Sequence, residues 1–511
     1  SHIAWGLTTH GFDVTDVYLE TITPGSGGNP DTVLFNGAQV PLETVTEVIV
    51  DGSGNDVTVE FQRVPHHGLI IPDSYSADGT EALSLRWTGN EPSNEVGAVV
   101  ELMQATDLDE VQQALRGFEE GGQNLLVITR EGDIFWITPE RLPIRDPRAL
   151  SWDAETLTGA TPCAVLPGTG EYEWTGMVEW PLLPQLLNPE EGFIVAANNA
   201  AVGVAADGDP LNDDLYIGCD FNVGHRAARI EELLEPLVSR GDVTPEEMQE
   251  IQNDAVSPLG RLLTAPLVAE LARAEEESTT GGTHPDLTDA VSVAGADRMA
   301  KVLEMRDRLV DWTSFDTPAG IEGSPSDEEI ADSVAATIFN VTFGHLLRLA
   351  FHDEYHRVDP DDDWASMVTA QLALLEPERL VSYDATLGDT VLWDDLDTDG
   401  VEETRGDRVL RAFLAALDWL EAELGADMGE WRWGHLHTIR LETVVPLLGA
   451  DPISIPTPDD PDFPDGFPRH GDRQTVDPAS FGNTELEDFT YGSGPQQRLV
   501  VEMTPEGPLV W

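Results

Sequence analysis

The chain has 511 residues, 41% of them hydrophobic, with 13 Trp and 16 Phe. This apolar content is typical of a folded chain with a large core and excludes an intrinsically disordered protein. The formal net charge is −68, because 95 acidic residues face only 27 basic ones. This charge excludes nucleic acid and anionic membranes as partners, and no apolar run approaches the length expected of a membrane span.

The acidic residues are spread over the whole length, and Lys301 is the only lysine. Repulsion among so many like charges destabilises a folded chain in dilute buffer, whereas molar salt screens it. We therefore predict a host adapted to high salt, such as a haloarchaeon. The two cysteines, Cys163 and Cys219, allow one disulfide and are too few for a metal cluster.

Residues 1–225 are predicted to form a sheet-rich part, because short β-branched and apolar runs alternate there with Gly, Asn or Asp turns. The predicted strands are Thr46–Val50, Val57–Phe61, Leu69–Ile71, Leu125–Thr129 and Phe193–Ala197. One helix is predicted at Asp107–Phe118, where apolar residues recur at helical spacing.

Residues 226–435 are predicted to be a mainly helical insertion. Thr244 and Ser326 each begin a capping box, and Gly425 closes a helix rich in leucine. Alternation returns in His437–Val445 and Arg498–Met503, separated by the Pro- and Asp-rich loop Pro456–Pro468. Residues 436–511 are therefore predicted to return strands to the core, so that the whole chain forms one structural unit.

The segment Gly192–Asn199 is an apolar run that ends in two side-chain amides, Asn198 and Asn199. Amide donors held at the end of a rigid strand can stabilise a developing negative charge. A strand that runs into an Asn-rich turn has the same composition, so this segment alone leaves both interpretations open.

Other segments extend this pattern, namely Ile3–Tyr18, Pro162 with Pro167–Gly176, and Asn198–Asp214 with Arg226. Here the chain resembles the penicillin acylase family of N-terminal nucleophile hydrolases, which includes cephalosporin acylases and acyl-homoserine lactone acylases. The resemblance covers nearly the whole chain, with further blocks at His67-Gly68, Asn124–Gly132, Asn188–Gly192, Trp431–His437 and Gly466–Asp472.

The resemblance implies an α+β fold, an αββα sandwich of antiparallel sheets with a large helical insertion. It also implies an amidohydrolase that cleaves the amide bond of an N-acyl compound, such as a penicillin-type β-lactam. In the family an N-terminal Ser, Cys or Thr, freed by self-cleavage, attacks the carbonyl with its own α-amine as the base.

Three residues match catalytic positions of the family. Asn198 matches the side-chain donor of the oxyanion hole, and Thr9 matches the residue whose backbone N–H is the second donor. Arg226 matches an arginine that orients the nucleophile and the asparagine. An exposed arginine at a helix start is the plainer interpretation, although helix starts favour acids.

The resemblance also implies structural calcium. Its ligands would be the carboxylates of Asp13, Asp16 and Asp214 with the carbonyls of Thr15 and Pro162, a set of hard oxygen donors. Asp213 is the alternative to Asp214, because the match there needs a one-residue gap. If the distant ligands meet at one ion, Cys163 and Cys219 come near each other, and a disulfide becomes a hypothesis.

The acyl pocket is where the chain departs most from the family. Leu7 stands at a small polar position of penicillin G acylases, Gly11 at an aromatic position and Gln123 at an aliphatic one. Changes at three substrate contacts can alter acyl preference strongly, so a phenylacetyl group is not implied.

Ser1 is not expected to be the nucleophile. It lies eight residues before Thr9, on the strand that in the family follows the nucleophile after a hairpin. We therefore expect the nucleophile, the final strands and an α-subunit from the same precursor to lie outside this chain. A secreted or cell-surface location is favoured, with any signal peptide also outside.

Alternative functions stay open. The chain could be a non-catalytic, calcium-stabilised binding module or an acyl-homoserine lactone acylase. His352 and His356 lie at zinc-ligand spacing, but the zincin motif needs Glu directly after the first histidine. Asp395–Gly400 begins like an EF-hand loop, but Gly406 stands where the final Glu belongs, so a helix-entry loop is the competing interpretation.

Overall fold

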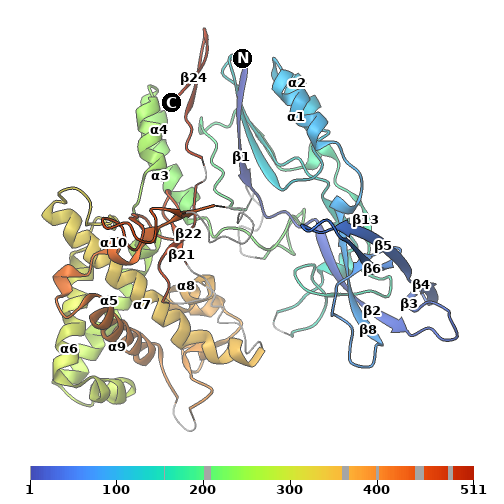
Figure 1. Cartoon of the computed structure of the whole chain (residues 1–511). Helices are drawn as coiled ribbons and strands as arrows, with labels where there is room; N and C mark the ends of the chain where they lie inside the picture. The colour runs from blue at the N-terminus through green and yellow to red at the C-terminus, as the bar shows by residue number, and fades with distance from the viewer. Residues whose placement is uncertain are drawn as a thin grey trace. The chain divides into compact units, whose positions relative to one another are not determined.

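A computed structural model of the chain is shown in Figure 1. It describes residues 2–154, 156–200, 209–358, 367–398, 402–443, 454–481, 487–495 and 497–511, without the side chains of residues 355, 356 and 358. The chain divides into two compact units. The sheet unit is Ser1–Ala227 with Val501–Trp511, and the helical unit is Ala228–Val500.

A four-stranded antiparallel sheet carries the start of the chain. Its strand order is β1 (Ile3–Thr9), β9 (Gln123–Thr129), β10 (Ile134–Ile137) and β14 (Gln185–Leu187). Alternate residues of β9 point to opposite faces, as strand geometry requires. Leu125 and Val127 pack with the helices α1 (Glu95–Gln104) and α2 (Leu108–Leu115), whereas Leu126 packs into a second apolar cluster.

An eight-stranded sheet forms the rest of this unit. Its order is β4 (Ala38–Pro41), β3 (Thr32–Phe35), β2 (Thr15–Thr23), β8 (Glu81–Trp87), β7 (Gly68–Ile70), β6 (Asp56–Val64) and β5 (Glu43–Val50), with β12 (Leu166–Pro167) parallel to β2. Strand β2 buries alternate residues, namely Asp16, Tyr18, Glu20 and Ile22. Two acids therefore point into the interior of the sheet unit. The unit is completed by β11 (Pro143–Arg145), β13 (Trp174–Met177), β23 (Val501–Thr504) and β24 (Gly507–Val510).

The helical unit packs around one large apolar core. Its helices are α4 (Pro245–Gln252), α5 (Pro258–Thr279), α6 (Thr288–Asp311), α7 (Asp327–Val358), α8 (Met367–Leu375), α9 (Arg405–Leu424) and α10 (Trp433–Leu436), and α3 (His225–Arg240) runs across the unit boundary. Short strand pairs accompany them, β15 (Tyr383–Asp384) with β16 (Asp389–Thr390), β17 (Thr438–Ile439) with β20 (Phe467–Pro468), β18 (Leu441–Glu442) with β19 (Ser454–Ile455), and β21 (Ser480–Phe481) with β22 (Tyr491–Ser493).

The helix signals of the sequence are confirmed. Thr244 and Glu247 form both halves of a capping box at the start of α4. Ser326 and Glu329 exchange the same pair of bonds before α7, at 2.7 and 3.2 Å. Gly425 ends α9 with φ of 89°, a left-handed conformation that glycine adopts without a steric penalty.

Helix α7 contains a stretch that meets the length and hydropathy criteria for a membrane span, although the sequence was expected to contain no such stretch. Residues Asp327–Glu354 of α7 are long and apolar enough to cross a membrane, with a mean hydropathy of 1.4. The core helix of a folded domain meets the same test, and 78% of this stretch is buried within the structure. Residues of α7 such as Ile338 and Leu346 are fully buried in the core of the helical unit.

The predicted layout is corrected in three places. Residues 436–500 belong to the helical unit, so only the hairpin of β23 and β24 returns to the sheet unit. Phe193–Ala197 does not form a strand, because a run of high β-propensity still needs a partner strand. Near this segment, the described residues form a single bridge between Asn199 and Asn222. Helix α1 was missed. The α+β class, with antiparallel sheets and helices, is confirmed.

Candidate active site

The register of β1 on β9 turns the backbone of Thr9 away from its partner strand. The amide of His10 donates to the carbonyl of Gly122 at 3.0 Å, and the carbonyl of His2 accepts from Arg130 at 2.9 Å. Even-numbered residues of this stretch therefore face β9, and the N–H and C=O of Thr9 face the opposite edge. Among the described strands β1 pairs only with β9, so this edge is open for further hydrogen bonding.

Asn198 meets Thr9 at that edge. Its Nδ2 donates to the Thr9 carbonyl at 2.6 Å, and its Oδ1 accepts from a guanidinium nitrogen of Arg226 at 2.7 Å. Arginine is only a donor, so the bond to Arg226 fixes which end of the amide faces Thr9. No second acceptor for the Asn198 Nδ2 group lies among the described residues.

Arg226 is held by the same short segment. The nitrogen that binds Asn198 also donates to the carbonyl of Ala197 at 2.9 Å, and burial lowers the pKa of the arginine. Asn198 has φ of 63°, a left-handed conformation that asparagine tolerates better than most residues. A half-buried cation in the first turn of a helix is unfavourable unless its partners compensate, and Arg226 is bonded to the carbonyl oxygens of Ala197 and Asn198.

Asn124 is a supporting residue that the sequence analysis did not single out. It is buried at the start of β9 and donates to the Thr9 carbonyl at 3.3 Å. Its own carbonyl accepts from Trp136 at 3.1 Å and from Thr138 at 2.8 Å. A buried asparagine in an otherwise apolar strand is the sequence signal that could have revealed it, because such amides need hydrogen-bond partners.

Two of the three predicted pocket residues share a face of the sheet. Gln123 is the direct cross-strand partner of Thr9, and Leu7 lies two residues earlier on β1. Both side chains therefore point to the face that α1 and α2 cover. Leu7 is 48% exposed, which leaves an apolar surface beside the Asn198–Thr9 pair. A hollow of about 510 Å³ in the helical unit contains none of these residues.

Steric crowding explains why a glycine stands at position 11. A Cβ atom at this position would lie 1.9 Å from the carbonyl oxygen of Asp220. Backbone cannot yield by that amount, so the glycine permits the segment around Gly218 to cross the end of β1 closely. The absence of an aromatic side chain at position 11 is explained by this crossing, and no substrate contact is needed to account for it.

Asp13 and Asp16, two of the predicted calcium ligands, both bind Arg145. The guanidinium contacts Asp16 at 3.0 and 3.1 Å and Asp13 at 3.1 Å, and the Asp16 and Arg145 side chains are fully buried. Tyr216 donates to Asp13 at 2.7 Å, and Trp174 donates to Asp16. Burial raises the pKa of Asp13, and Arg145 opposes that rise.

In this arrangement the donors do not fit a calcium ion. Both aspartates already have a cation between them, and calcium would have to displace Arg145 before it could bind their oxygens. Of the other predicted ligands, Thr15 begins β2 and bonds to Asp13 at 3.2 Å, Pro162 is buried and Asp214 is exposed. Calcium stays a prediction of the resemblance.

Cys163 and Cys219 form a disulfide, with their Cα atoms 6.1 Å apart. This distance lies in the ordinary range for such a bond. Tyr216, which contacts Asp13, lies against both sulfur atoms at 3.6 and 3.8 Å. The bond therefore ties the segment before β12 to the one that crosses Gly11.

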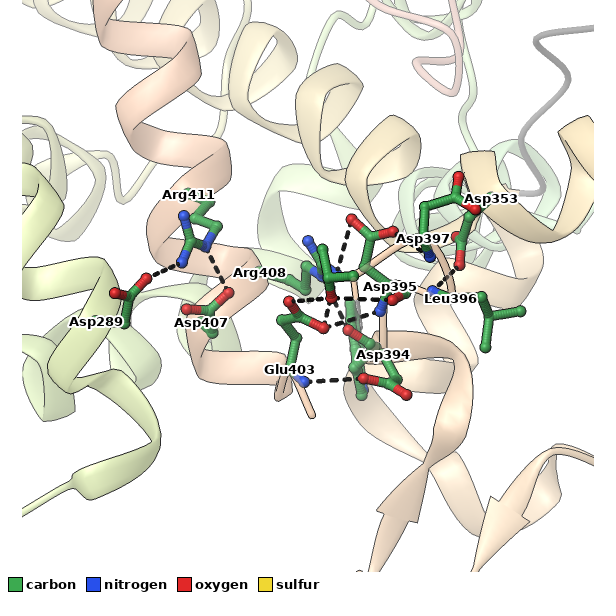
Figure 2. Close-up of polar contacts among 12 residues, drawn as sticks. Asp289, Asp353, Asp394, Asp395, Leu396, Asp397, Glu403, Asp407, Arg408 and Arg411 are labelled. Atoms are coloured by element: carbon green, nitrogen blue, oxygen red, sulfur yellow. Dashed lines mark hydrogen bonds and ion pairs between the residues drawn. The ribbon is translucent and has the colours of Figure 1, made fainter. Parts of the chain in front are cut away.

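The EF-hand interpretation is not supported by the contacts at Asp395. Figure 2 shows the acids before α9 bonded to backbone amides and to buried Arg408. Asp394 accepts from the amide of Glu403 at 3.0 Å, and Asp395 accepts from that of Asp397. These are the contacts of a helix-entry loop. The side chain of His356, needed for the zinc alternative, lies outside the described residues.

Replacing Arg145 tests its electrostatic role. We expect Arg145→Met to lower the free energy of unfolding by about 3–5 kcal/mol, because it leaves buried Asp16 and half-buried Asp13 without their cation. Urea denaturation at constant salt measures the change. Arg148→Met is the matched control, since Arg148 is exposed and pairs with nearby Asp146, and it should cause no measurable loss. Equal effects of both substitutions would contradict this role.

The disulfide is tested by alkylation and mass spectrometry. We expect no alkylation of the unfolded, unreduced chain and two alkyl groups after reduction. Replacing both cysteines by serine should lower the free energy of unfolding by about 4 kcal/mol, because the bond closes a loop between residues separated by 56 positions. Two alkyl groups without reductant would show that the cysteines are free.

Comparison with known proteins places this chain in a family. The family model described as penicillin amidase matches residues 1–511, the whole chain. An acyl-homoserine lactone acylase, QuiP of Pseudomonas aeruginosa, is 24% identical over 99% of this chain and 55% of its own length. Penicillin acylase 2 proenzyme of Pseudomonas sp. (strain SE83) is 27% identical over 51% of this chain and 30% of its own length.

A solved structure supports the same assignment at the level of the fold. The thermostable penicillin G acylase from Alcaligenes faecalis matches with a TM-score of 0.54 and 18% identity, over 84% of this chain and 69% of that one. This chain spans about half the length of QuiP. From the family match over its whole length, the chain belongs to the penicillin amidase family.

Proposed function

We propose that this chain carries the oxyanion hole of an amide hydrolase that acts on N-acyl compounds. The observation that carries the proposal is the hydrogen-bonded series from Arg226 through Asn198 to Thr9 at the open edge of β1. Membership of the penicillin amidase family supports it, since relatives are named as acylases. A non-catalytic binding module would have no need for this arrangement of donors.

The chemistry follows from what each donor can do. In the family the nucleophile is an N-terminal residue, and we expect it on a segment that precedes β1 in the precursor. Its attack puts negative charge on the carbonyl oxygen of the scissile amide. The free N–H of Asn198 and the backbone N–H of Thr9 would bind that oxygen, while Arg226 keeps the Asn198 amide from rotating.

The acyl group is proposed to be apolar. Leu7 offers exposed apolar surface on the face that Gln123 shares, and both lie within one strand pair of Thr9. Two acyl classes fit the relatives, those of acyl-homoserine lactones and of penicillins. Both classes stay candidates, because QuiP matches 99% of the chain at 24% identity and penicillin acylase 2 proenzyme matches 51% of it at 27% identity.

The remaining proposals concern the whole protein. We propose that an α-subunit cut from the same precursor completes the active site beside β1, consistent with the name proenzyme of one relative. The disulfide between Cys163 and Cys219 supports maturation in an oxidising compartment. Calcium is retained as a hypothesis for the holoenzyme, to be tested by metal analysis of the processed protein.

Replacing Asn198 tests the oxyanion hole. In the full precursor, expressed and processed in high salt, we expect Asn198→Ala to lower kcat by about 10²–10³-fold, because one donor to the developing charge is lost. Rates are measured with acyl-homoserine lactone, β-lactam and aryl-amide substrates. Asn199→Ala is the control, since the Asn199 amide bonds to the backbone of Ala197 and Ala200.

Two results would overturn the proposal. One is a processed wild-type enzyme that hydrolyses none of the three substrate classes. The other is an Asn198→Ala enzyme that keeps its rate while its thermal midpoint matches that of the wild type.

We also propose that the fold is adapted to high salt. The charge of −68 is screened over about 10 Å at 0.1 M salt and about 3 Å at 1 M, so repulsion across the surface should fall steeply between these concentrations. We expect the thermal midpoint to rise when NaCl is raised from about 0.1 to about 1 M. A sucrose solution of equal osmolality is the control, and an equal rise there would argue against screening.

A further inference from the structure

A second polar cluster lies in the sheet unit, outside the residues of the proposed active site. Glu20, His66 and His67 each offer one ligand atom, and these atoms lie within 4.8 Å of one another. Glu20 comes from β2, and the two histidines occupy the turn between β6 and β7. Glu20 and His67 are fully buried, and His66 is partly buried.

The hydrogen bonds of this cluster are incomplete. The Oε1 atom of Glu20 accepts from Ser84 at 2.7 Å and contacts His67 Nδ1 at 2.6 Å. Within the described residues, its Oε2 atom has no hydrogen-bond partner, and neither does Nε2 of His66. A buried carboxylate oxygen without a partner is costly, so this atom points to a missing cation or donor.

The orientation of His67 is fixed from the other side. Its Nε2 lies 2.8 Å from Glu173, and its ring stacks on Tyr18 with a centroid distance of 3.8 Å. Glu173 can only accept when ionised, so Nε2 of His67 carries a proton. Nδ1 lies against the Glu20 carboxylate, so either a second proton or a metal ion supplies the positive charge between them.

A second proton, on Nδ1 of His67, would supply this positive charge but would not satisfy the whole cluster. It would satisfy the contact of His67 with Glu20 Oε1, but it would leave Glu20 Oε2 and His66 Nε2 without partners. A metal ion can take all three residues at once. Gly168 keeps the space beside Oε2 open, because a Cβ atom there would lie 2.6 Å from that oxygen.

We propose that Glu20, His66 and His67 bind one zinc ion that joins β2 to the turn between β6 and β7. Two imidazole nitrogens and one carboxylate oxygen are a common zinc donor set, whereas calcium prefers oxygen donors alone. Glu173 acts as the outer carboxylate that orients His67, and Arg86 holds Glu173 in turn at 3.0 Å. The ion is structural here, as it would neutralise buried Glu20 within the sheet.

Zinc content and affinity test this proposal. The chain is stripped with a chelator, given equimolar zinc in high salt to suppress binding by surface acids, and analysed by mass spectrometry of the metal. We expect one zinc per chain in the wild type. His66→Gln should lose it without unfolding, because His66 Nε2 makes no hydrogen bond to any residue that the structure describes.

The controls separate this site from others. His284→Gln removes a surface histidine that faces Glu276 at 3.2 Å, and it should keep the full zinc content. Glu173→Gln should weaken zinc binding by about 10–100-fold, the usual effect of removing an outer carboxylate. Cobalt in place of zinc should give the visible absorption of a four-coordinate ion in the wild type alone.

Either of two results would overturn the proposal. The first is a wild type whose zinc content does not exceed that of His66→Gln. The second is a cobalt spectrum that is the same for both proteins. Each would show that a second proton on His67, and not a metal, occupies the space beside Glu20.

Discussion

The antiparallel pairing of β1 with β9 is the constraint on which the proposed active site depends. Because backbone groups of a strand alternate between its two edges, the bond from His10 to Gly122 also determines where the groups of Thr9 point. A shift of one residue in this register would turn the Thr9 N–H into the sheet and remove it from the site. The buried apolar residues of β9 hold the register, since a shift would expose Leu125 and Val127.

Two arginines of the sheet unit each hold polar side chains in place. Arg226 holds the amide of Asn198, and Arg145 holds the two acids that flank the start of β2. A chain with so few cations places Arg145 in the interior and Arg226 in a half-buried position of this unit. This choice is physically reasonable because a buried acid without a partner destabilises a fold more than a screened surface acid does.

The sequence predicted those features that depend on local rules. Capping boxes at Thr244 and Ser326 and the glycine stop at Gly425 were read correctly, because each depends on a few adjacent residues. The prediction of a strand at Phe193–Ala197 was wrong, because strand formation needs a partner that can lie far along the chain, and local composition does not contain that information.

Some residues of the candidate site could likewise be predicted from the sequence, and others could not. Asn198, Thr9 and Arg226 could be named from the family resemblance, and the structure brings them into one hydrogen-bonded series. Arg145 could not be foreseen, because its contacts with Asp13 and Asp16 join residues about 130 positions apart. The same holds for Glu20 and His67, whose meeting depends on the order of strands in the larger sheet.

The central claim is that Asn198 and Thr9 bind the oxygen of a tetrahedral intermediate. A crystal structure of the processed enzyme with a covalent transition-state mimic, such as a boronate on the nucleophile, tests it most directly. The account predicts one oxygen of the mimic within hydrogen-bond distance of both Asn198 Nδ2 and the Thr9 amide nitrogen, with Arg226 still on Asn198 Oδ1. A mimic whose oxygens all point away from Asn198 would contradict it.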